Sequence, residues 1–408
     1  MRRTAAAVLW VLATATVAAG LVAPAWAAEA AGAAGARDGR PAVVSVGDSA
    51  ISGEAGRWAG NTNGLPARVD ALGPTAYFDN AAGTGEAIPG CHRSKAAEIH
   101  IGGRVSSVNL ACSGAHTATK PFSAGADFKP GLDFYDDGAG HIGQAKALQA
   151  YAATHNVKMV VVLIGANDYG FADIVGNCVA HWLLSPAWAP SFCQDDPFLS
   201  NRFTAANQAA ITAHVAGAFQ NLRTAMRNDG YADDDWTLVA QTYSTPVPRG
   251  SQFRYPQSSW TRQVIGGCGI WDHDADWAND TAVVAMNTSI RGAIGPSGLT
   301  NVKLLDLQNL LVGHRLCENT AGLLEEKGVP SWTSPGAADR SEWVNQVRTL
   351  TTIGGPYLLQ EDLHPNYWGQ KALRNCVRQA YDHGSPRGGT CTAVGGLNAA
   401  GEPNTVLR

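Results

Sequence analysis

Short apolar runs that alternate with helical segments constrain the fold of this chain more than any other feature. The runs lie at 41–46, 104–111, 158–164, 236–241 and 302–307, and helical spacing marks 143–155, 205–228, 280–293 and 366–382. Most runs are continuously apolar rather than alternately apolar and polar, which is typical of strands covered on both faces. Strands that alternate with helices pair in parallel through crossovers. We therefore predict an α/β fold with a five-stranded parallel sheet.

Polar residues follow the first three of these runs. Gly47-Asp48-Ser49 follows the first run, Ser113-Gly114 the second, and Gly165-Ala166-Asn167-Asp168 the third. Parallel sheets bind their ligands at the carboxyl ends of the strands. The three blocks are therefore expected to meet at one edge of the sheet and to form a site there.

The first residues have the order of a secretory signal peptide. Arg2 and Arg3 precede an apolar stretch at about 5–22, and Ala25-Trp26-Ala27 follows as a cleavage-like site. The alternative is a membrane anchor, but Gly20 interrupts the stretch and Pro24 follows its end. We predict a signal peptide at 1–28, a flexible leader at 29–40 and a secreted, extracellular protein without a stable membrane anchor.

The eight cysteines fit either metal ligands or disulfides. No pair has the Cys-x-x-Cys spacing of a zinc or redox site, and export favours disulfides. Eight cysteines allow 105 pairings, so the sequence does not determine the connectivity. Pairing between neighbours is the prediction, which gives Cys91–Cys112, Cys178–Cys193, Cys268–Cys317 and Cys376–Cys391.

Three long segments interrupt the strand and helix pattern. They lie at 171–204, 243–280 and 312–360 and are rich in Trp, Pro, Gly and Cys. Segments of this length are surface elaborations that shape the mouth of a pocket. The apolar loop between Cys178 and Cys193 either faces an acyl chain or covers a small satellite core.

Ser49 has the setting of a nucleophile. A serine needs a base to lose its proton at neutral pH, and hydrogen-bond donors to stabilise the oxyanion that forms. The backbone N–H groups of Ser49 and Gly114 and the side chain of Asn167 are candidate donors on neighbouring strand ends. His364 is the candidate base, because it precedes the last helix and has acids two and three residues upstream.

Four blocks stand in a fixed order along the chain. They are Gly47-Asp48-Ser49 with Ser52-Gly53-Glu54, then Asn109 to Gly114, then Gly165 to Asp168, then His364-Pro365-Asn366. Together they resemble the SGNH, or GDSL-type, serine hydrolases, and the cysteine pattern resembles the secreted actinobacterial esterases and lipases of that family. The resemblance spans 41–383. It implies a flavodoxin-like three-layer α/β/α sandwich with long disulfide-stapled loops, a hydrolase domain at 41–391 and a C-terminal tail at 392–408.

The resemblance also implies a role for each matching residue. Ser49 corresponds to the nucleophile, His364 to the general base, and Ser49, Gly114 and Asn167 to the oxyanion hole. The family usually has Asp-x-x-His in its last block, whereas this chain has Glu361 three residues before His364. We predict Glu361 as the group that orients His364. Asp362 and a backbone carbonyl remain as alternatives.

Other site types find less support in the sequence. Asp272-His273-Asp274-Ala275-Asp276 resembles the start of a calcium loop but lacks its glycine and its final glutamate, so a solvated acidic loop is the favoured interpretation. The remaining histidines have no metal spacing, and no nucleotide or flavin fingerprint occurs. No metal and no cofactor are predicted. A net charge of −4 without a basic run also argues against nucleic acid as a partner.

The sequence thus predicts a monomeric esterase or lipase. Its substrate would be a small-molecule or lipid ester, cleaved through a serine acyl-enzyme. A carbohydrate deacetylase, an enzyme that cleaves an ester or lactone on a metabolite, and a non-catalytic binding module remain as alternatives.

Overall fold

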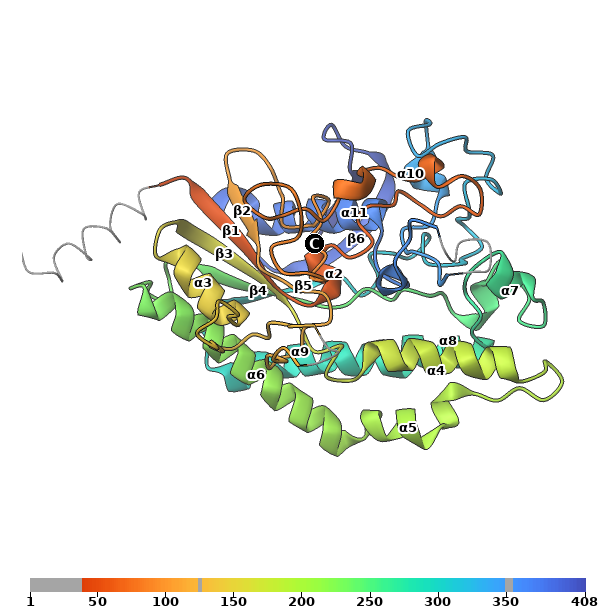
Figure 1. Ribbon diagram of the computed structural model, residues 1–408, viewed down its shortest axis with the longest axis horizontal. Coiled ribbons are helices and arrows are strands. Elements are labelled where there is room, and N and C mark those ends of the chain that lie inside the picture. The colour runs from red at the N-terminus through yellow and green to blue at the C-terminus, as the bar shows by residue number, and fades with distance from the viewer. Residues whose placement is uncertain (1–38, 124–126, 349–354) are drawn as a thin grey trace, which may run out of the picture.

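The computed structural model describes residues 39–123, 127–348 and 355–408. The predicted signal peptide and most of the predicted leader lie outside these residues. Within them, seven strands form one sheet in the order β2-β1-β3-β4-β5-β6-β7 (Figure 1). The strands are β1 (Pro41–Gly47), β2 (Ser106–Asn109), β3 (Asn156–Leu163), β4 (Thr237–Gln241), β5 (Val302–Asp306), β6 (Gly389–Leu397) and β7 (Pro403–Leu407).

The apolar runs of the sequence form the parallel part of this sheet. β1 to β5 coincide with the predicted runs and pair in parallel throughout. Their order, 2-1-3-4-5, is that of flavodoxin-like doubly wound folds. The carboxyl ends of β1, β2 and β3, where the polar blocks begin, therefore lie side by side.

The prediction of a five-stranded sheet is wrong, because two more strands extend it. β6 pairs parallel to β5 through Leu305 and Gly389, and β7 pairs antiparallel to β6. The sequence of β6 is GTCTAVGGL, in which glycines interrupt the apolar residues and only Cys391 is buried. It therefore lacks the continuous apolar signal of the central strands. The residues predicted as a C-terminal tail, 392–408, contribute to both added strands.

Helices lie on both faces of the sheet, so the fold has three layers (Figure 1). α6 and α9 pack against each other on one face, and α11 lies on the other face. The helices are α2 (Ser49–Ser52), α3 (Gln144–Ala152), α4 (Phe171–Leu184), α5 (Pro197–Ser200), α6 (Ala205–Asn228), α7 (Thr261–Val264), α8 (Asp272–Trp277), α9 (Val283–Ser297), α10 (Ala337–Arg340) and α11 (Tyr367–Tyr381). None of those in the described ranges is both long and apolar enough to cross a membrane.

The helical spacing in the sequence identifies the buried faces of two of these helices. In α6 the residues predicted to point inward are all buried: Ile211, Val215, Phe219, Leu222 and Met226. In α11 the same holds for Trp368, Leu373, Val377 and Tyr381. Burial of such a face, rather than intrinsic helix propensity, supplies most of a helix's stability in a folded protein.

The four disulfides are those predicted from neighbour pairing. They join Cys91 to Cys112, Cys178 to Cys193, Cys268 to Cys317 and Cys376 to Cys391. The first ties a loop to the segment that follows β2, and the second ties α4 to the turn Cys193–Asp195. The last ties α11 to β6. The staples therefore hold segments near the carboxyl ends of the strands as well as the edge of the sheet.

Candidate active site

Ser49 stands at a sharp turn from β1 into α2. Gly47, the last residue of β1, has φ +140°, and a Cβ there would lie 1.9 Å from the carbonyl oxygen of Leu163, so only glycine fits. Asp48 caps α2, because its carboxylate accepts a hydrogen bond of 3.2 Å from the N–H of Ala50. Ser49 is the first residue of α2 and faces a cavity. The turn therefore presents the hydroxyl at the carboxyl edge of the sheet.

The Asp48 side chain also connects this turn to the interior of the protein. Its side chain is fully buried, and the Tyr243 hydroxyl donates a hydrogen bond to it. Burial raises the pKa of Asp48 to about 7, although the hydrogen bonds from Tyr243 and Ala50 oppose that rise. The same hydroxyl accepts a hydrogen bond of 3.0 Å from the N–H of Ala166. Asp48 and Tyr243 thus connect the block after β1 to the block after β3.

The structure brings His364 to Ser49. The His364 Nε2 lies 2.6 Å from the Ser49 Oγ. The peptide around His364 is held by Asn345, whose N–H donates to the His364 carbonyl at 3.0 Å and whose carbonyl accepts from the Leu363 N–H at 3.1 Å. Burial lowers the pKa of His364. The imidazole is therefore neutral at pH 7 and able to take the proton of the serine.

The structure corrects the prediction that Glu361 orients His364. The His364 Nδ1 lies 3.0 Å from the backbone carbonyl oxygen of Asp362. The Glu361 carboxylate is turned elsewhere and accepts hydrogen bonds from the Tyr77 hydroxyl at 2.6 Å and the Trp58 indole at 2.8 Å. The reason is the path of the chain: Leu363 has φ +59°, which turns the peptide and not the upstream side chain toward His364.

The Asp362 side chain is held by Arg348, which is part of no sequence motif. Arg348 donates to the two Asp362 carboxylate oxygens, from its Nε at 2.9 Å and from its backbone N–H at 3.1 Å. Both side chains are largely buried. This clamp fixes the residue whose carbonyl faces His364. Arg348 lies fourteen positions before Asp362 and belongs to no motif, so no local signal identifies it.

Two of the three predicted oxyanion donors, Ser49 and Asn167, line one cavity. Asn167 lines the same cavity as Ser49 and His364, and its amide donates one hydrogen bond of 2.8 Å to the Ala115 carbonyl. That bond uses one of the two N–H groups of the amide. Gly114 precedes Ala115, has φ +79° and stands outside the described lining of the cavity. Ser49, His364 and Asn167 therefore line the same cavity. Gly114 directly precedes Ala115, the residue whose carbonyl accepts the hydrogen bond from Asn167.

An apolar cavity begins at Ser49 and continues along α4. The Phe171 ring packs edge-on against the His364 ring, with centroids 5.6 Å apart. A second, almost wholly apolar hollow adjoins the first. Five residues line both hollows: Phe171, Pro246, Val283, Met286 and Leu363. The second hollow passes Ile174 and Cys178 and reaches Trp277. The long segments 171–204 and 243–280 thus shape the cavity, as the sequence predicts.

The acidic segment 272–276 does not gather its carboxylates. Asp272 pairs with Arg262 at 2.6 Å. Asp274 is buried and accepts from the backbone N–H groups of Cys193 and Gln194, while Asp276 accepts from the N–H of Gly250. Each side chain thus serves a different backbone or ionic contact. Within the described ranges, no cluster of three histidine, cysteine or acidic residues has the geometry of a metal site.

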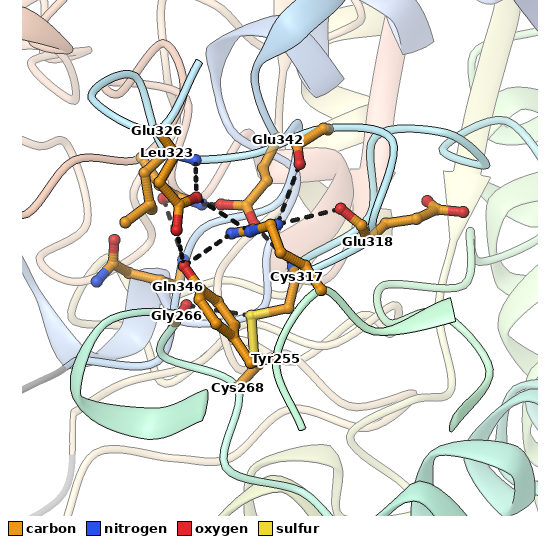
Figure 2. A network of polar contacts seen from close by, with 12 residues as sticks. Tyr255, Gly266, Cys268, Cys317, Glu318, Leu323, Glu326, Glu342 and Gln346 are labelled. Atoms are coloured by element: carbon orange, nitrogen blue, oxygen red, sulfur yellow. Dashed lines mark hydrogen bonds and ion pairs between the residues drawn. A yellow bond between two sulfur atoms is a disulfide. The ribbon is translucent and has the colours of Figure 1, made fainter. Parts of the chain in front are cut away.

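A polar network that includes Glu342, Glu326 and Cys317 is shown in Figure 2. Arg254 pairs with Glu342 at 2.8 Å and with Glu326 at 3.0 Å. Glu342 also accepts from the N–H of Cys317 at 2.7 Å, beside the Cys268–Cys317 disulfide. Glu342 begins the stretch that contains Asn345. The network therefore anchors the stretch that makes the two backbone hydrogen bonds around His364.

Comparison with solved structures finds distant neighbours of this chain, among them two Streptomyces proteins. No protein-family profile and no curated protein matches this sequence. The extracellular lipase of Streptomyces rimosus is similar over 83% of this chain and 99% of its own, with 17% sequence identity and a TM-score of 0.45. The phospholipase A1 of Streptomyces albidoflavus NA297 is similar over 84% of this chain and 99% of its own, with 16% identity and a TM-score of 0.42. Likeness of this degree establishes neither family nor function.

Proposed function

We propose that this protein is an extracellular serine esterase of the SGNH type that hydrolyses acyl esters. The observation that carries the proposal is the 2.6 Å contact between the Ser49 Oγ and the Nε2 of a buried His364. A serine is a weak nucleophile until an adjacent base takes its proton, and this distance is within hydrogen-bond reach. The contact lies at the start of an apolar cavity, where an acyl chain has room to bind.

The reaction takes two steps. In the first, the Ser49 Oγ attacks the ester carbonyl carbon while its proton moves to the His364 Nε2, and a tetrahedral oxyanion forms. The N–H groups of Ser49 and Gly114 and the Asn167 amide stabilise that oxyanion. His364 then gives the proton to the leaving alcohol, and the acyl-enzyme remains. In the second step, a water molecule gives a proton to His364 and its oxygen attacks the acyl carbon. The bond from that carbon to the Ser49 Oγ then breaks, and His364 returns the proton to the Oγ, which releases the acid and restores the enzyme.

The carbonyl of Asp362 takes the place that a carboxylate has in a Ser-His-Asp triad. It accepts the Nδ1–H of His364 and thus leaves Nε2 unprotonated toward Ser49. A carbonyl carries a dipole and no full charge, so it stabilises the imidazolium less than a carboxylate does. The proposed site is therefore a Ser–His dyad whose histidine is positioned by the backbone. The Arg348–Asp362 clamp supplies the rigidity that this arrangement requires.

The substrate class follows from the lining of the cavity. The second hollow is bounded by Ile174, Val247, Ile270 and other apolar side chains, and its one acidic residue, Asp274, is already hydrogen-bonded to backbone N–H groups. Each methylene group transferred from water into such a space contributes about 0.8 kcal/mol. We therefore propose esters with medium or long acyl chains rather than acetyl esters as the preferred substrates.

The test is Ser49→Ala, assayed with p-nitrophenyl esters of increasing chain length. Loss of the nucleophile is expected to lower kcat by roughly 10³-fold or more. Thermal melting serves as the control that the variant is folded. A fluorophosphonate probe should label the natural protein and not the variant. Retained turnover by Ser49→Ala would refute the proposal, and a rate that falls beyond acetate would refute the substrate class.

A further inference from the structure

A group of apolar side chains stands exposed at the far end of α4. Leu184 and Trp188 are each 86% exposed, Trp260 is 62% exposed and Leu183 is 40% exposed. We name these four residues the tryptophan patch. Exposed apolar side chains that gather in one place mark an interaction site more often than single ones do.

The two segments that form the patch lie side by side. The rings of Trp182 and Trp260 pack edge-on with centroids 5.5 Å apart, and a surface hollow lies between Ser185 and Trp260. In Figure 1, α4 extends away from the strands and ends near α7, which begins directly after Trp260. The patch is therefore one surface built from the end of α4, the loop that follows it and the residue before α7.

The scaffold beneath the patch is fixed. The Trp182 indole donates to the Gln257 carbonyl at 3.1 Å, and the Trp271 indole donates to the Ser185 hydroxyl at 3.2 Å. The Cys178–Cys193 disulfide closes the loop that contains Trp188. Both buried indole N–H groups thus have a hydrogen-bond acceptor, and the disulfide constrains the loop. The exposed rings therefore project from a fixed base and can contact a partner without rearrangement.

The patch carries no charge. Residues 182–192 and 256–261 contain no Asp, Glu, Lys, Arg or His. The adjacent Arg262 is fully buried and pairs with Asp272. Anionic membranes are recognised by clusters of Lys and Arg, which these two segments lack. Tryptophan, in contrast, prefers the boundary between lipid headgroups and acyl chains, where its ring is apolar and its N–H is polar.

One face of α4 runs from the apolar cavity toward the patch. Phe171, Ile174, Cys178 and Trp182 lie on one face of α4, at helical spacing, and the first three line the cavity. From Phe171, which contacts His364, to Trp182 the helix rises about 16 Å. The inner end of α4 thus borders the candidate active site, and its outer end carries the exposed side chains.

We propose that the tryptophan patch docks this protein onto the surface of a zwitterionic phospholipid bilayer. Trp188 and Trp260 would lie at the level of the headgroups, and Leu184 would reach the acyl chains below them. Docking there places the outer end of α4 at the lipid surface and its inner end at the candidate active site. The inference rests on the proposed function, because it assigns a lipid surface as the place where that function operates.

The test measures binding without hydrolysis. The Ser49→Ala protein is sedimented with phosphatidylcholine vesicles, and the same protein with Trp188→Ser and Trp260→Ser is compared with it. Binding is expected to weaken roughly tenfold, because each substitution removes apolar area that the interface would bury. Leu65→Ser, at a side chain that is 75% exposed outside the patch, is the matched control and should bind normally.

Three results would overturn the inference. The first is equal vesicle binding by the two proteins. The second is binding that requires anionic phosphatidylglycerol in the vesicles. The third is a doubled mass by light scattering that disappears with Trp188→Ser, since the patch would then hold a second copy of this chain.

A separate measurement distinguishes this inference from the proposed function. With Ser49 intact, the double tryptophan variant should hydrolyse soluble p-nitrophenyl butyrate at the natural rate. Loss of vesicle binding with retained hydrolysis by both proteins supports the docking role. Vesicle binding by a natural protein that hydrolyses no ester leaves the docking surface standing and removes the proposed function.

Discussion

Two regions of the protein meet at His364, and different kinds of interaction stabilise them. Residues 342–348 and 358–364, which we name the polar wall, are fixed by directional contacts such as the Arg348–Asp362 pair and the backbone hydrogen bonds of Asn345. α4 and residues 270–286, the apolar wall, are held by side-chain packing and by the Cys178–Cys193 disulfide.

The difference separates two tasks of the proposed enzyme. A catalytic base must hold its nitrogen within a few tenths of an ångström of the serine, and hydrogen bonds give that precision because they depend on angle as well as distance. An acyl chain has no fixed end point, and apolar contact is non-directional. Changes in the polar wall should therefore alter kcat, whereas changes in the apolar wall should alter chain-length preference.

The largest expected effect is on stability and involves two disulfides with loops of equal length. Cys178–Cys193 lies in the apolar wall, and Cys376–Cys391 lies at the edge of the sheet; each closes 15 residues. Removing either by a double Cys→Ala change should cost about 3 kcal/mol, measured by denaturant unfolding, because both loops gain the same freedom in the unfolded chain.

Comparing these two variants also tests whether the apolar wall determines acyl-chain preference. Loss of Cys178–Cys193 should also lower hydrolysis of a dodecanoyl ester relative to an acetyl ester, since that disulfide fixes α4. Loss of Cys376–Cys391 should leave the ratio unchanged. Equal ratios in both variants would show that the stapled loop takes no part in substrate preference.

The next effect comes from filling the apolar hollow. Ile174 lines the second hollow only, away from Ser49. Ile174→Trp should exclude three or more methylene groups of a long chain, which at about 0.8 kcal/mol each predicts a roughly 50-fold fall in kcat/KM for a dodecanoyl ester. The acetyl ester, which does not reach the hollow, is the internal control. A parallel loss on both esters would point to misfolding instead.

The polar wall is tested by Asp362→Asn. If the carbonyl of Asp362 orients His364, loss of the charge that binds Arg348 loosens the peptide and should lower kcat about tenfold with little change in KM. If the carboxylate were the triad acid, the same change should lower kcat by roughly 10⁴-fold. Steady-state kinetics with a soluble ester separate the two cases without ambiguity.

Glu361→Gln is the matched control for that variant. Glu361 accepts hydrogen bonds from Tyr77, Trp58 and the N–H of Leu358, and an amide NH₂ in its place faces at least one donor. The expected cost is about 1–3 kcal/mol of stability, with kcat close to the natural value. A large loss of kcat in a folded Glu361→Gln protein would restore Glu361 as the orienting group.

The sequence contains the reacting atoms of the candidate site but not their support. Ser49 and Asn167 are predictable because each follows a strand, and parallel strands bring those ends together. The choice between Glu361 and a carbonyl depends on the backbone angle at Leu363, which residue type does not determine. Arg348 meets Asp362 only through tertiary folding. Strand β6 is not predicted because its glycines interrupt the apolar pattern that identifies a strand.

The smallest expected effect is the pH dependence of the polar wall. Burial lowers the pKa of His364 below its ordinary value of 6.5, more than the negative charge of Glu54 raises it. The base must be neutral to act, so kcat/KM should fall with a midpoint below pH 6.5 and should keep more than about half of its plateau value at pH 6.5. The free energy of unfolding should depend on pH in the same direction. The histidine binds a proton more readily in the unfolded chain, so the stability that His364 contributes is present above pH 6.5 and is lost as the pH falls.

A pH–rate profile with a soluble acetyl ester measures the effect on kcat/KM. Acid unfolding of His364→Gln measures the second, with a shallower loss expected. A midpoint above 6.5 would mean that the charge of Glu54 outweighs burial.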